Sequence, residues 1–464
     1  MDILVILIAL LFLIFVAYRG FSVILFAPIA ALLAVLLTSP GNVLTFYSGI
    51  FMEKMVGFIK LYFPVFLLGA IFGKVIAMSG FAKSITAFIV RIFGGEKAML
   101  AIVVVGAILT YGGVSLFVVA FALYPFAAEL FKVANIPKRL IPATIALGAF
   151  TFTMDAFPGS PQIQNIIPTS FFKTDAWAAP WLGLTGGTFI FICGMIYLQW
   201  QKRKAAAKGE GYGTNHLNEP ADITEQRLPS PLLAILPLLL VGISNKLFTD
   251  IIPKYYGTSF DFAPLGIKDV PVLEIPKVTA IWAVEGALVI GILTVVFCSF
   301  KRIKNNFNAE INLSISGALL ATLNTASEYG FGGVIASLPG FKAVSAGIAS
   351  TFKDPLVNEA ITITTLSGIT GSASGGMSIA LAAMHETYIT QAAALGIPNE
   401  VLHRVASMAS GGMDTLPHNG AVITLLAVTG LTHRQSYKDI FVMTGFKTAA
   451  VFLIIVLYYL FGIV

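Results

Sequence analysis

Long apolar runs recur along this chain and decide which folds are open to it. The first two, residues 3–18 and 21–38, are separated only by Arg19 and Gly20. About 20 consecutive apolar residues span the hydrocarbon core of a bilayer as a helix. Charged residues make up 11% of the chain, against about 25% in soluble domains, and so few charges cannot cover a water-facing surface. The sequence therefore predicts a multi-pass helical membrane protein.

Charge and cysteine content point to a membrane partner and to no cofactor. The formal net charge of +6 does not predict a nucleic-acid partner, because Lys and Arg of membrane proteins concentrate in cytoplasmic loops. The chain starts with Met1 and Asp2 instead of a basic segment, so we expect the first run to be retained and not cleaved as a signal peptide. Cys193 and Cys298 lie in apolar runs without metal-ligand spacing, and we expect them to be buried apolar side chains.

Three short segments of the first half recur in the same order in the second half. Their offsets are 259, 263 and 259 residues. One such match is common in apolar sequence, but three in order at a nearly constant offset indicate an internal duplication. The matched segments are 72–81 with 331–341, 112–116 with 375–379, and 154–161 with 413–420.

The duplication divides the chain into two units joined by a linker. Residues 201–229 are rich in Lys, Arg and Gly and lack an apolar period, so we expect a flexible cytoplasmic linker there. Each unit is expected to have scaffold helices first, followed by a hairpin and a broken helix. The predicted units are 1–200, divided into 1–96 and 97–200, and 230–464, divided into 230–353 and 354–464.

Each unit is expected to contain five spanning helices, one of them interrupted, and one re-entrant helical hairpin. The hairpins are residues 98–131, broken at Gly112 and Gly113, and about 355–392, broken at 372–376. Both flanks of the first hairpin carry Lys or Arg, which places its two ends in the cytoplasm. The predicted spans are 3–18, 21–38, 59–78, 139–172 and 177–199 in the first unit, and 231–249, 277–299, 318–338, 402–431 and 439–462 in the second.

Five crossings are an odd number, so the second unit must have the opposite orientation in the membrane. Residues 39–58 carry one Lys and no Arg, as expected outside, whereas the matching stretch of the second unit begins with Lys301, Arg302 and Lys304, as expected inside. The same rule places both termini outside. The predicted fold class is an all-α polytopic membrane protein with two inverted-topology repeats, in a bacterial-type inner membrane.

Two helix breaks and two hairpin turns are expected to meet near the middle of the membrane. The breaks are residues 155–161 and 414–420, where Pro and Gly interrupt the helical ladder. We expect half-helices to start near Ser160 and Asn419, and the second hairpin arms to start directly after the two Gly-Gly pairs. Helix N-termini aimed at one point suit a small anion such as a carboxylate, as in inverted-repeat transporters. The predicted substrate-binding residues are Tyr111, Gly112, Gly113, Ser115, Gly159, Ser160, Ser374, Gly375, Gly376, Ser378, Thr415, His418 and Asn419.

Ionisable residues in the predicted spans are candidates for proton coupling, because a charge at membrane depth is costly. Asp155 and Asp414 hold equivalent positions, and each either takes up protons or caps a broken helix. His418, whose counterpart is Gly159, is a proton-binding or substrate-binding group or an ordinary hydrogen-bonded histidine. Glu328 is the fourth candidate. No Arg or other basic group lies within the two breaks, which favours a monocarboxylate over a dicarboxylate.

Three other function classes fit the sequence less well. An intramembrane aspartyl enzyme could use Asp155 and Asp414 as a carboxylate pair, but neither follows Gly-x-Gly and duplicated hairpins serve no catalytic purpose, so we expect no enzyme. A channel can also contain helix breaks, but no ring of like charges or filter repeat is present. The sequence has no Gly-x4-Gly-Lys-Ser/Thr loop, which argues against an ATP-driven pump.

The motifs at the hairpin turns and at the first break resemble those of the gluconate permease (GntP) family of the ion transporter superfamily. Residues 111–125, 152–164 and 374–378 carry the resemblance, which covers the whole chain. Within the family the chain is most similar to the D-beta-hydroxybutyrate permease branch. Sodium-coupled members of the superfamily have Ser-Asn-Thr motifs at these places. Their absence here argues against sodium coupling without excluding it.

The resemblance implies a secondary transporter for small hydroxy or sugar acids. The expected function is proton-linked uptake, as a symporter, of 3-hydroxybutyrate or a close hydroxy monocarboxylate. Gluconate or another sugar acid as substrate, and sodium as coupling ion, are the alternatives. The resemblance also implies a homodimer in which a transport domain moves as an elevator against a scaffold. The expected partners are therefore a small organic anion, the lipid bilayer and a second copy of the chain.

Overall fold

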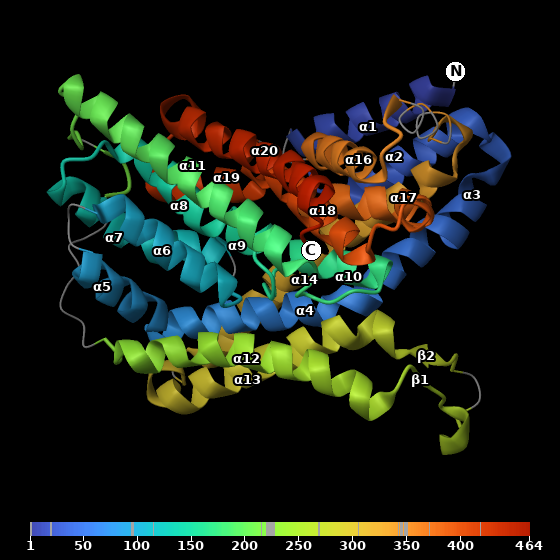
Figure 1. The fold of residues 1–464 in the computed structure, drawn as a ribbon, viewed down its shortest axis with the longest axis horizontal. Coiled ribbons are helices and arrows are strands. Elements are labelled where there is room, and N and C mark those ends of the chain that lie inside the picture. Colours follow the sequence, from blue (N-terminus) through green and yellow to red (C-terminus); the bar gives the residue numbers. More distant parts are fainter. Residues whose placement is uncertain are drawn as a thin grey trace.

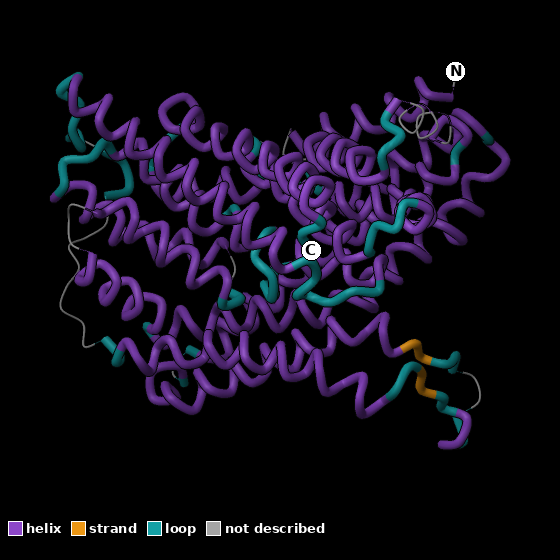
Figure 2. Tube along the Cα trace, in the orientation of Figure 1, coloured by secondary structure: helices purple, strands orange, loops and turns teal. Residues whose placement is uncertain are grey.

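The computed structural model of the protein is almost entirely helical, as the sequence predicts (Figures 1 and 2). Helices satisfy their own backbone hydrogen bonds, which hydrocarbon surroundings require. A two-residue antiparallel pair of strands, β1 (Ser259–Phe260) and β2 (Leu273–Glu274), closes one loop. The structure describes residues 2–18, 21–93, 97–114, 116–214, 216–219, 228–267, 270–304, 306–341, 343, 347, 351–370, 372–417 and 419–464.

The first half contains long helices, one helical hairpin and one broken helix. The hairpin turns after Tyr111, and the broken helix is interrupted between α8 and α10. The elements are α1 (Asp2–Tyr18), α2 (Val23–Thr38), η1 (Pro40–Asn42), α3 (Val43–Phe46), η2 (Tyr47–Phe51), α4 (Met52–Ser79), α5 (Phe81–Phe93), α6 (Ala98–Tyr111), α7 (Leu116–Val133), η4 (Lys138–Leu140), α8 (Ile141–Ala149), α9 (Phe152–Asp155), α10 (Ile163–Phe172) and α11 (Pro180–Ala207).

The second half repeats this order of two helices, a long helix, a hairpin, a broken helix and a last helix. Figure 1 shows the two hairpins toward opposite ends of the molecule. The inverted relation between the halves stays a prediction. The elements, with β1 and β2 between the first two helices, are α12 (Pro231–Tyr256), η5 (Ala263–Leu265), α13 (Ile275–Ile303), α14 (Phe307–Ser337), α16 (Pro355–Thr370), α17 (Ala373–Ala394), α18 (Asn399–Gly411), η6 (Gly412–Thr415), α19 (Gly420–Thr429), η7 (His433–Tyr437) and α20 (Lys438–Phe461).

Several helices are long and apolar enough to cross a membrane. Within the described ranges there are five such helices, and α14 is long enough but is not among them. The halves of the broken helices and the hairpin arms are shorter, because each is interrupted. The five are Pro40–Ser79, Pro180–Ala207, Pro231–Tyr256, Ile275–Ile303 and His433–Phe461, and four shorter apolar helices are Leu4–Leu13, Val23–Thr38, Ala98–Tyr111 and Gly420–Thr429.

Helix packing brings the two halves together. The long helices α4 and α14 pack against each other, α13 packs on α4, and α2 packs on α14. Each broken helix also contacts a hairpin of the other half, since α10 packs against α17 and α19 packs against α7. The breaks and the hairpin turns therefore belong to one assembly built from both halves.

The linker is fixed to the helix bundle by ion pairs at its start. Arg139 bonds to Glu210 at 2.7 Å and to Asp439 of α20 at 2.8 Å, and Lys138 bonds to Glu219 at 2.9 Å. The bond from Arg139 holds the pKa of Glu210 below its ordinary value. Residues 201–207 belong to α11, and these bonds tie residues 208–214 and 216–219 to the bundle, whereas residues 215 and 220–227 lie outside the described ranges. The flexibility of the linker stays a prediction.

The prediction that both cysteines are buried is wrong. Cys193 is partly exposed on α11, and Cys298 is exposed on α13. Both lie on helices that can span a membrane. An apolar thiol on such a helix can face lipid as easily as protein, because lipid chains are as apolar as the protein core.

Candidate functional site

The first helix break is centred on Asp155. α8 ends at Ala149, the four-residue α9 ends at Asp155, and α10 starts at Ile163. This start is later than the predicted one near Ser160, because the Ser160 hydroxyl donates to the Thr153 carbonyl (2.7 Å) and stays inside the turn. Gly159 has a φ of +79°, and a Cβ there would lie 2.6 Å from ring carbons of Trp177. Gly159 is thus needed for the turn and for the close approach of Trp177.

Asp155 is fully buried and forms an ion pair with a lysine from the last helix. The Lys447 Nζ lies 2.9 Å from Asp155 Oδ2, and Lys447 itself is 1% exposed. Lys447 also donates to the carbonyl of Phe150 at 2.9 Å and to that of Gly411. A Cβ on Gly411 would overlap Asp155 Oδ2, so the end of α18 closes over this carboxylate. Asp155 therefore joins the two broken helices and does not cap either of them.

A second buried cation, Arg404 of α18, completes the first break. Its guanidinium donates to the carbonyls of Asp155 (3.1 Å) and Ala178 (2.6 Å) and to the side-chain oxygen of Asn165 (3.0 Å). The neighbouring His403 is also buried and contacts the same Asn165 oxygen at 3.2 Å. These bonds replace backbone partners that the helix break leaves unpaired.

Arg404 and Lys447 correct the prediction that no basic group lies at the breaks. Neither lies within a break, and the breaks themselves contain no Arg or Lys. A lysine in the middle of the predicted span 439–462 was the available signal, because charges inside spanning helices are rare and functional. Sequence reasoning also missed Glu359 of α16, which is fully buried with no hydrogen-bond partner among the described residues for either carboxylate oxygen.

The second break is centred on Asp414. α18 ends at Gly411, η6 carries Asp414, and α19 starts at Gly420. The half-helix thus starts next to Asn419, as predicted, and Asn419 caps it by accepting the amide of Ala421 at 2.8 Å. The Asp414 carboxylate accepts from Gln164 of α10 at 2.8 Å and from Asn419 at 3.3 Å. Asp414 of the second break thus contacts the first break, and Asp155 of the first break contacts the end of α18 at the second break.

Thr415 is buried beside Asp414. Its hydroxyl lies 2.6 Å from that of Thr444 on α20, and its carbonyl accepts from Tyr437 at 3.3 Å. These bonds anchor the break to η7 and α20. Thr415 is therefore a supporting residue of the second break in this conformation.

The turn of the first hairpin lies at the predicted glycines and docks on the first break. Gly113 has a φ of +92°, which favours glycine, and a Cβ on Gly112 would lie 2.5 Å from the Leu238 side chain. Tyr111 donates to the carbonyl of Pro158 at 2.7 Å. Gln162 donates to the carbonyl of Thr110 at 2.7 Å, so the residues at the hairpin turn are tied to the start of α10.

The turn of the second hairpin differs from the prediction. α17 starts at Ala373, so Ser374, Gly375 and Gly376 lie in its first turn and do not precede it. Ser372 caps the helix by accepting the amide of Gly375 at 3.1 Å. Ser378 is consequently inside the helix, fully buried, with no hydrogen-bond partner for its hydroxyl among the described residues.

Two predicted site residues, Ser115 and His418, lie outside the described residues. The other predicted residues gather in two places. Tyr111, Gly112 and Gly113 adjoin the first break, and the second hairpin turn lies near Asp414 at Ala373. The region where α10, α17 and α19 meet is named the central site below.

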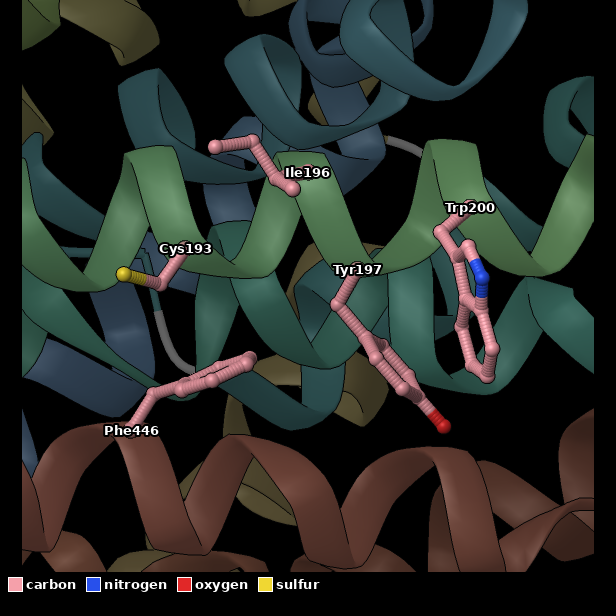
Figure 3. A pocket seen from close by; sticks show the side chains of 5 residues that line it. All are labelled: Cys193, Ile196, Tyr197, Trp200 and Phe446. Atoms are coloured by element: carbon pink, nitrogen blue, oxygen red, sulfur yellow. The ribbon is translucent and has the colours of Figure 1, made fainter.

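Two surface clefts lie outside the central site. The apolar one, between α11 and α20, is lined by Cys193, Ile196, Tyr197, Trp200 and Phe446, and Figure 3 shows these side chains around it. The only polar group that they offer besides the Trp200 indole is the Tyr197 hydroxyl, which already donates to Asp439 at 2.7 Å. This cleft offers little to hold a carboxylate.

The other cleft is polar and has a volume of about 490 Å³. Its walls come from the end of α10 and the start of α18 on one side, and from α12 and α13 on the other. It lies next to the buried network of the first break, because the Thr174 hydroxyl in its wall is 2.7 Å from His403 Nδ1. The lining includes Lys173, Thr174, Asp175, Thr249, Thr279, Asn399 and Glu400.

The comparisons at the sequence level point to a transporter. The family model described as GntP family permease matches residues 1–254. A Bacillus subtilis (strain 168) protein named "Uncharacterized transporter YxjC" is 62% identical to this chain over 472 residues, and the alignment covers 100% of both chains. The solved Alcanivorax borkumensis YdaH transporter, described as having an unusual topology, matches with a TM-score of 0.48 and 14% identity over 92% of this chain and 90% of that chain.

Proposed function

Because this chain belongs to the GntP family of permeases, we propose that it is a secondary active transporter that takes up a small hydroxy monocarboxylate together with protons. The best candidate substrate is 3-hydroxybutyrate. The observation that carries the proposal is the convergence of three helix starts on Asp414. Its carboxylate accepts from Gln164 at the start of α10 and from Asn419, the cap of α19, and it lies near the backbone of Ala373 at the start of α17. Helix N-termini that meet in this way suit an anion.

The charges around the central site support a substrate with one carboxylate. Lys447 is paired with Asp155, and Arg404 is engaged by carbonyls and Asn165. Among the described residues, neither cation is left over to neutralise a second substrate carboxylate. The hydroxyl of a hydroxy acid needs only neutral partners, and Ser374 in the first turn of α17 can supply one.

The polar cleft supports an alternating-access pathway. Its walls combine α12 and α13, which belong to the predicted scaffold, with α10 and α18, which belong to the predicted transport domain. In an elevator mechanism the broken helices and hairpins would move together past α4, α13 and α14 and carry the central site across the membrane. Inward movement with one proton and one monoanion is electroneutral, so uptake would follow the pH gradient and not the voltage.

The decisive experiment is uptake of labelled (R)-3-hydroxybutyrate into proteoliposomes of the full chain, with an inward proton gradient and no sodium. Gluconate, lactate and D-serine serve as competitors. Gradient-dependent uptake that resists gluconate is the expected result. Competition by gluconate alone would identify a sugar-acid transporter of the same family. Uptake only after sodium is added would reject proton coupling, and transport of none of the four anions would reject the proposed function.

The oligomer and the orientation are part of the same proposal. Exposed apolar side chains are frequent on α1, α2, α12 and α13, and these helices would serve as scaffold and as contact surface of a homodimer. A mass measurement of the purified protein in lipid nanodiscs tests this, since a monomer would contradict it. Both termini would lie outside the cell and the linker in the cytoplasm.

A further inference from the structure

The N-terminus of α17 is already occupied by carboxylates of the protein. Asp414 lies near the backbone of Ala373, and Glu328 of α14 contacts the first turn of the helix. A Cβ on Gly375 would overlap Glu328 Oε2, so this oxygen touches the first turn of α17 where glycine leaves room for it. The Ser372 hydroxyl, which caps the same helix, donates to Glu328. A carboxylate here is stabilised by the partial positive charge of the helix N-terminus.

Glu328 is buried and poorly supplied with partners. It is 5% exposed, and its Oε2 has no hydrogen-bond partner among the described residues. By contrast, Asp414 accepts from both Gln164 and Asn419, and such donors favour the charged form of a carboxylate. Protonation therefore costs Glu328 fewer stabilising hydrogen bonds than it costs Asp414, the other carboxylate at this helix start.

No described cation pairs with Glu328. Its helix α14 packs against α2, α4, η2 and α17, and α2 carries no charged residue. On α4, Lys74 pairs with Glu310 of α14, and Lys54 packs its side-chain carbons against Gly333. The titratable residues of the packed elements and of α14 itself are Tyr47, Glu53, Lys54, Lys60, Tyr62, Lys74, Glu310, Tyr329, His385, Glu386 and Tyr388, with Asp414 across the helix start.

We infer that Glu328 carries the coupled proton, because its carboxylate and the substrate carboxylate compete for the N-terminus of α17. The inference rests on the proposed function. Two anions a few ångströms apart in a water-poor site repel strongly. The substrate can therefore occupy the helix start only when Glu328 has taken up a proton from the outer solution. When the site opens inward, the substrate leaves, Glu328 returns its proton to the inner solution, and its carboxylate reoccupies the helix start.

The first test measures binding of labelled (R)-3-hydroxybutyrate to the full chain in nanodiscs between pH 5.5 and 8.5. If one proton is taken up with each anion, the Kd of the wild type rises about 10-fold per pH unit in the pH range in which free Glu328 is deprotonated. Glu328→Gln should bind at pH 8.5 about as tightly as the wild type does at pH 5.5. Glu328→Asp should keep the pH dependence, and Glu285→Gln, a carboxylate change on α13, is the matched control that should keep it too.

The second test separates coupling from structure in proteoliposomes. Glu328→Gln should exchange labelled for unlabelled substrate but should fail to accumulate it from a pH gradient. A Glu328→Gln protein that keeps the 10-fold slope, or that loses binding at every pH, would overturn the inference. If 3-hydroxybutyrate does not bind the wild type, the same measurements are made with whichever of gluconate, lactate and D-serine binds.

If none of these anions binds, the proposed function fails, and a substrate-free readout still tests Glu328. A cysteine replaces Ser374 at the hairpin turn in a Cys193→Ala and Cys298→Ala background, and its alkylation rate is followed with pH. Because thiols react as thiolates, each rate is divided by that of a free thiol at the same pH. Release of the neutral Glu328 from α17 predicts a low relative rate at high pH and a high relative rate at low pH, and a high relative rate at all pH values in Glu328→Gln. Equal rates in both proteins would overturn the inference.

Discussion

Lys447 is the residue through which the first helix break is held together. Its ammonium group reaches Asp155 and the carbonyls of Phe150 and Gly411, so one side chain satisfies partners on three segments. An ion pair that is fully buried is costly to form, but breaking it leaves a lone buried charge, which costs more. The pair is therefore a requirement of the folded state and a poor candidate for a group that titrates in every transport cycle.

We predict that Lys447→Met destabilises the protein by about 3–5 kcal/mol, because Asp155 is left as an unpaired buried carboxylate. Adding Asp155→Asn should recover a large part of the loss. The measurement is unfolding of the purified protein in detergent for both variants and the double variant. If the double variant is no more stable than Lys447→Met alone, the two side chains do not depend on each other.

The residues of the breaks could be predicted, but their partners could not. Pro and Gly clustered within a few residues interrupt a helix, so Asp155 and Asp414 were identifiable from the local sequence. The cations that balance Asp155 come from α18 and α20, and nothing local in the sequence of the break specifies them. A buried lysine in an apolar span indicates that a partner exists but not which carboxylate it is.

At the scale of elements, the two Gly-Gly pairs have different tasks. Gly112 and Gly113 form the turn of the first hairpin, with Gly113 in the left-handed region. Gly375 and Gly376 are helical and let α17 approach Glu328 and the backbone of Ser367 on α16. The same sequence pattern therefore serves as a turn in one hairpin and as a packing surface in the other. Spacing alone cannot distinguish these uses, which explains why Ser378 was placed at a helix start.

We expect Gly376→Ala to reduce uptake more than 10-fold and to destabilise the protein by about 1–3 kcal/mol, as overpacking does. A Cβ there would overlap backbone atoms of Ser367, so the hairpin arms must separate at the turn. Gly445→Ala on α20 is the control, since no atom lies within 4 Å of its added Cβ, and alanine there should stabilise by up to about 1 kcal/mol. Uptake assays and thermal unfolding measure both effects, and normal uptake by Gly376→Ala would show that the turn can relax.

At the scale of the whole molecule, the order of helices follows from the sequence because it depends on apolar runs and helix breakers. Most predicted spans coincide with helices, and the hairpins and broken helices lie at the predicted segments. The arrangement of the halves depends instead on contacts such as α10 with α17 and α19 with α7, which no local pattern encodes. The orientation in the membrane is set by the distribution of Lys and Arg and needs a measurement of its own.

The two halves are inverted relative to each other if equivalent loops lie on opposite sides of the membrane. The loop after α2 and the loop after α13 are equivalent in the predicted repeat, and Gly41 and Lys304 are exposed in them. Figure 1 shows α3, which follows the first loop, at the right-hand end, whereas α13 runs leftward from β2.

In a Cys193→Ala and Cys298→Ala background, Gly41→Cys should react with a membrane-impermeant maleimide in intact cells, and Lys304→Cys should react only after permeabilisation. Reaction of both from one side would reject inversion, while the reversed pattern would keep inversion and reverse the orientation that the positive charges predict.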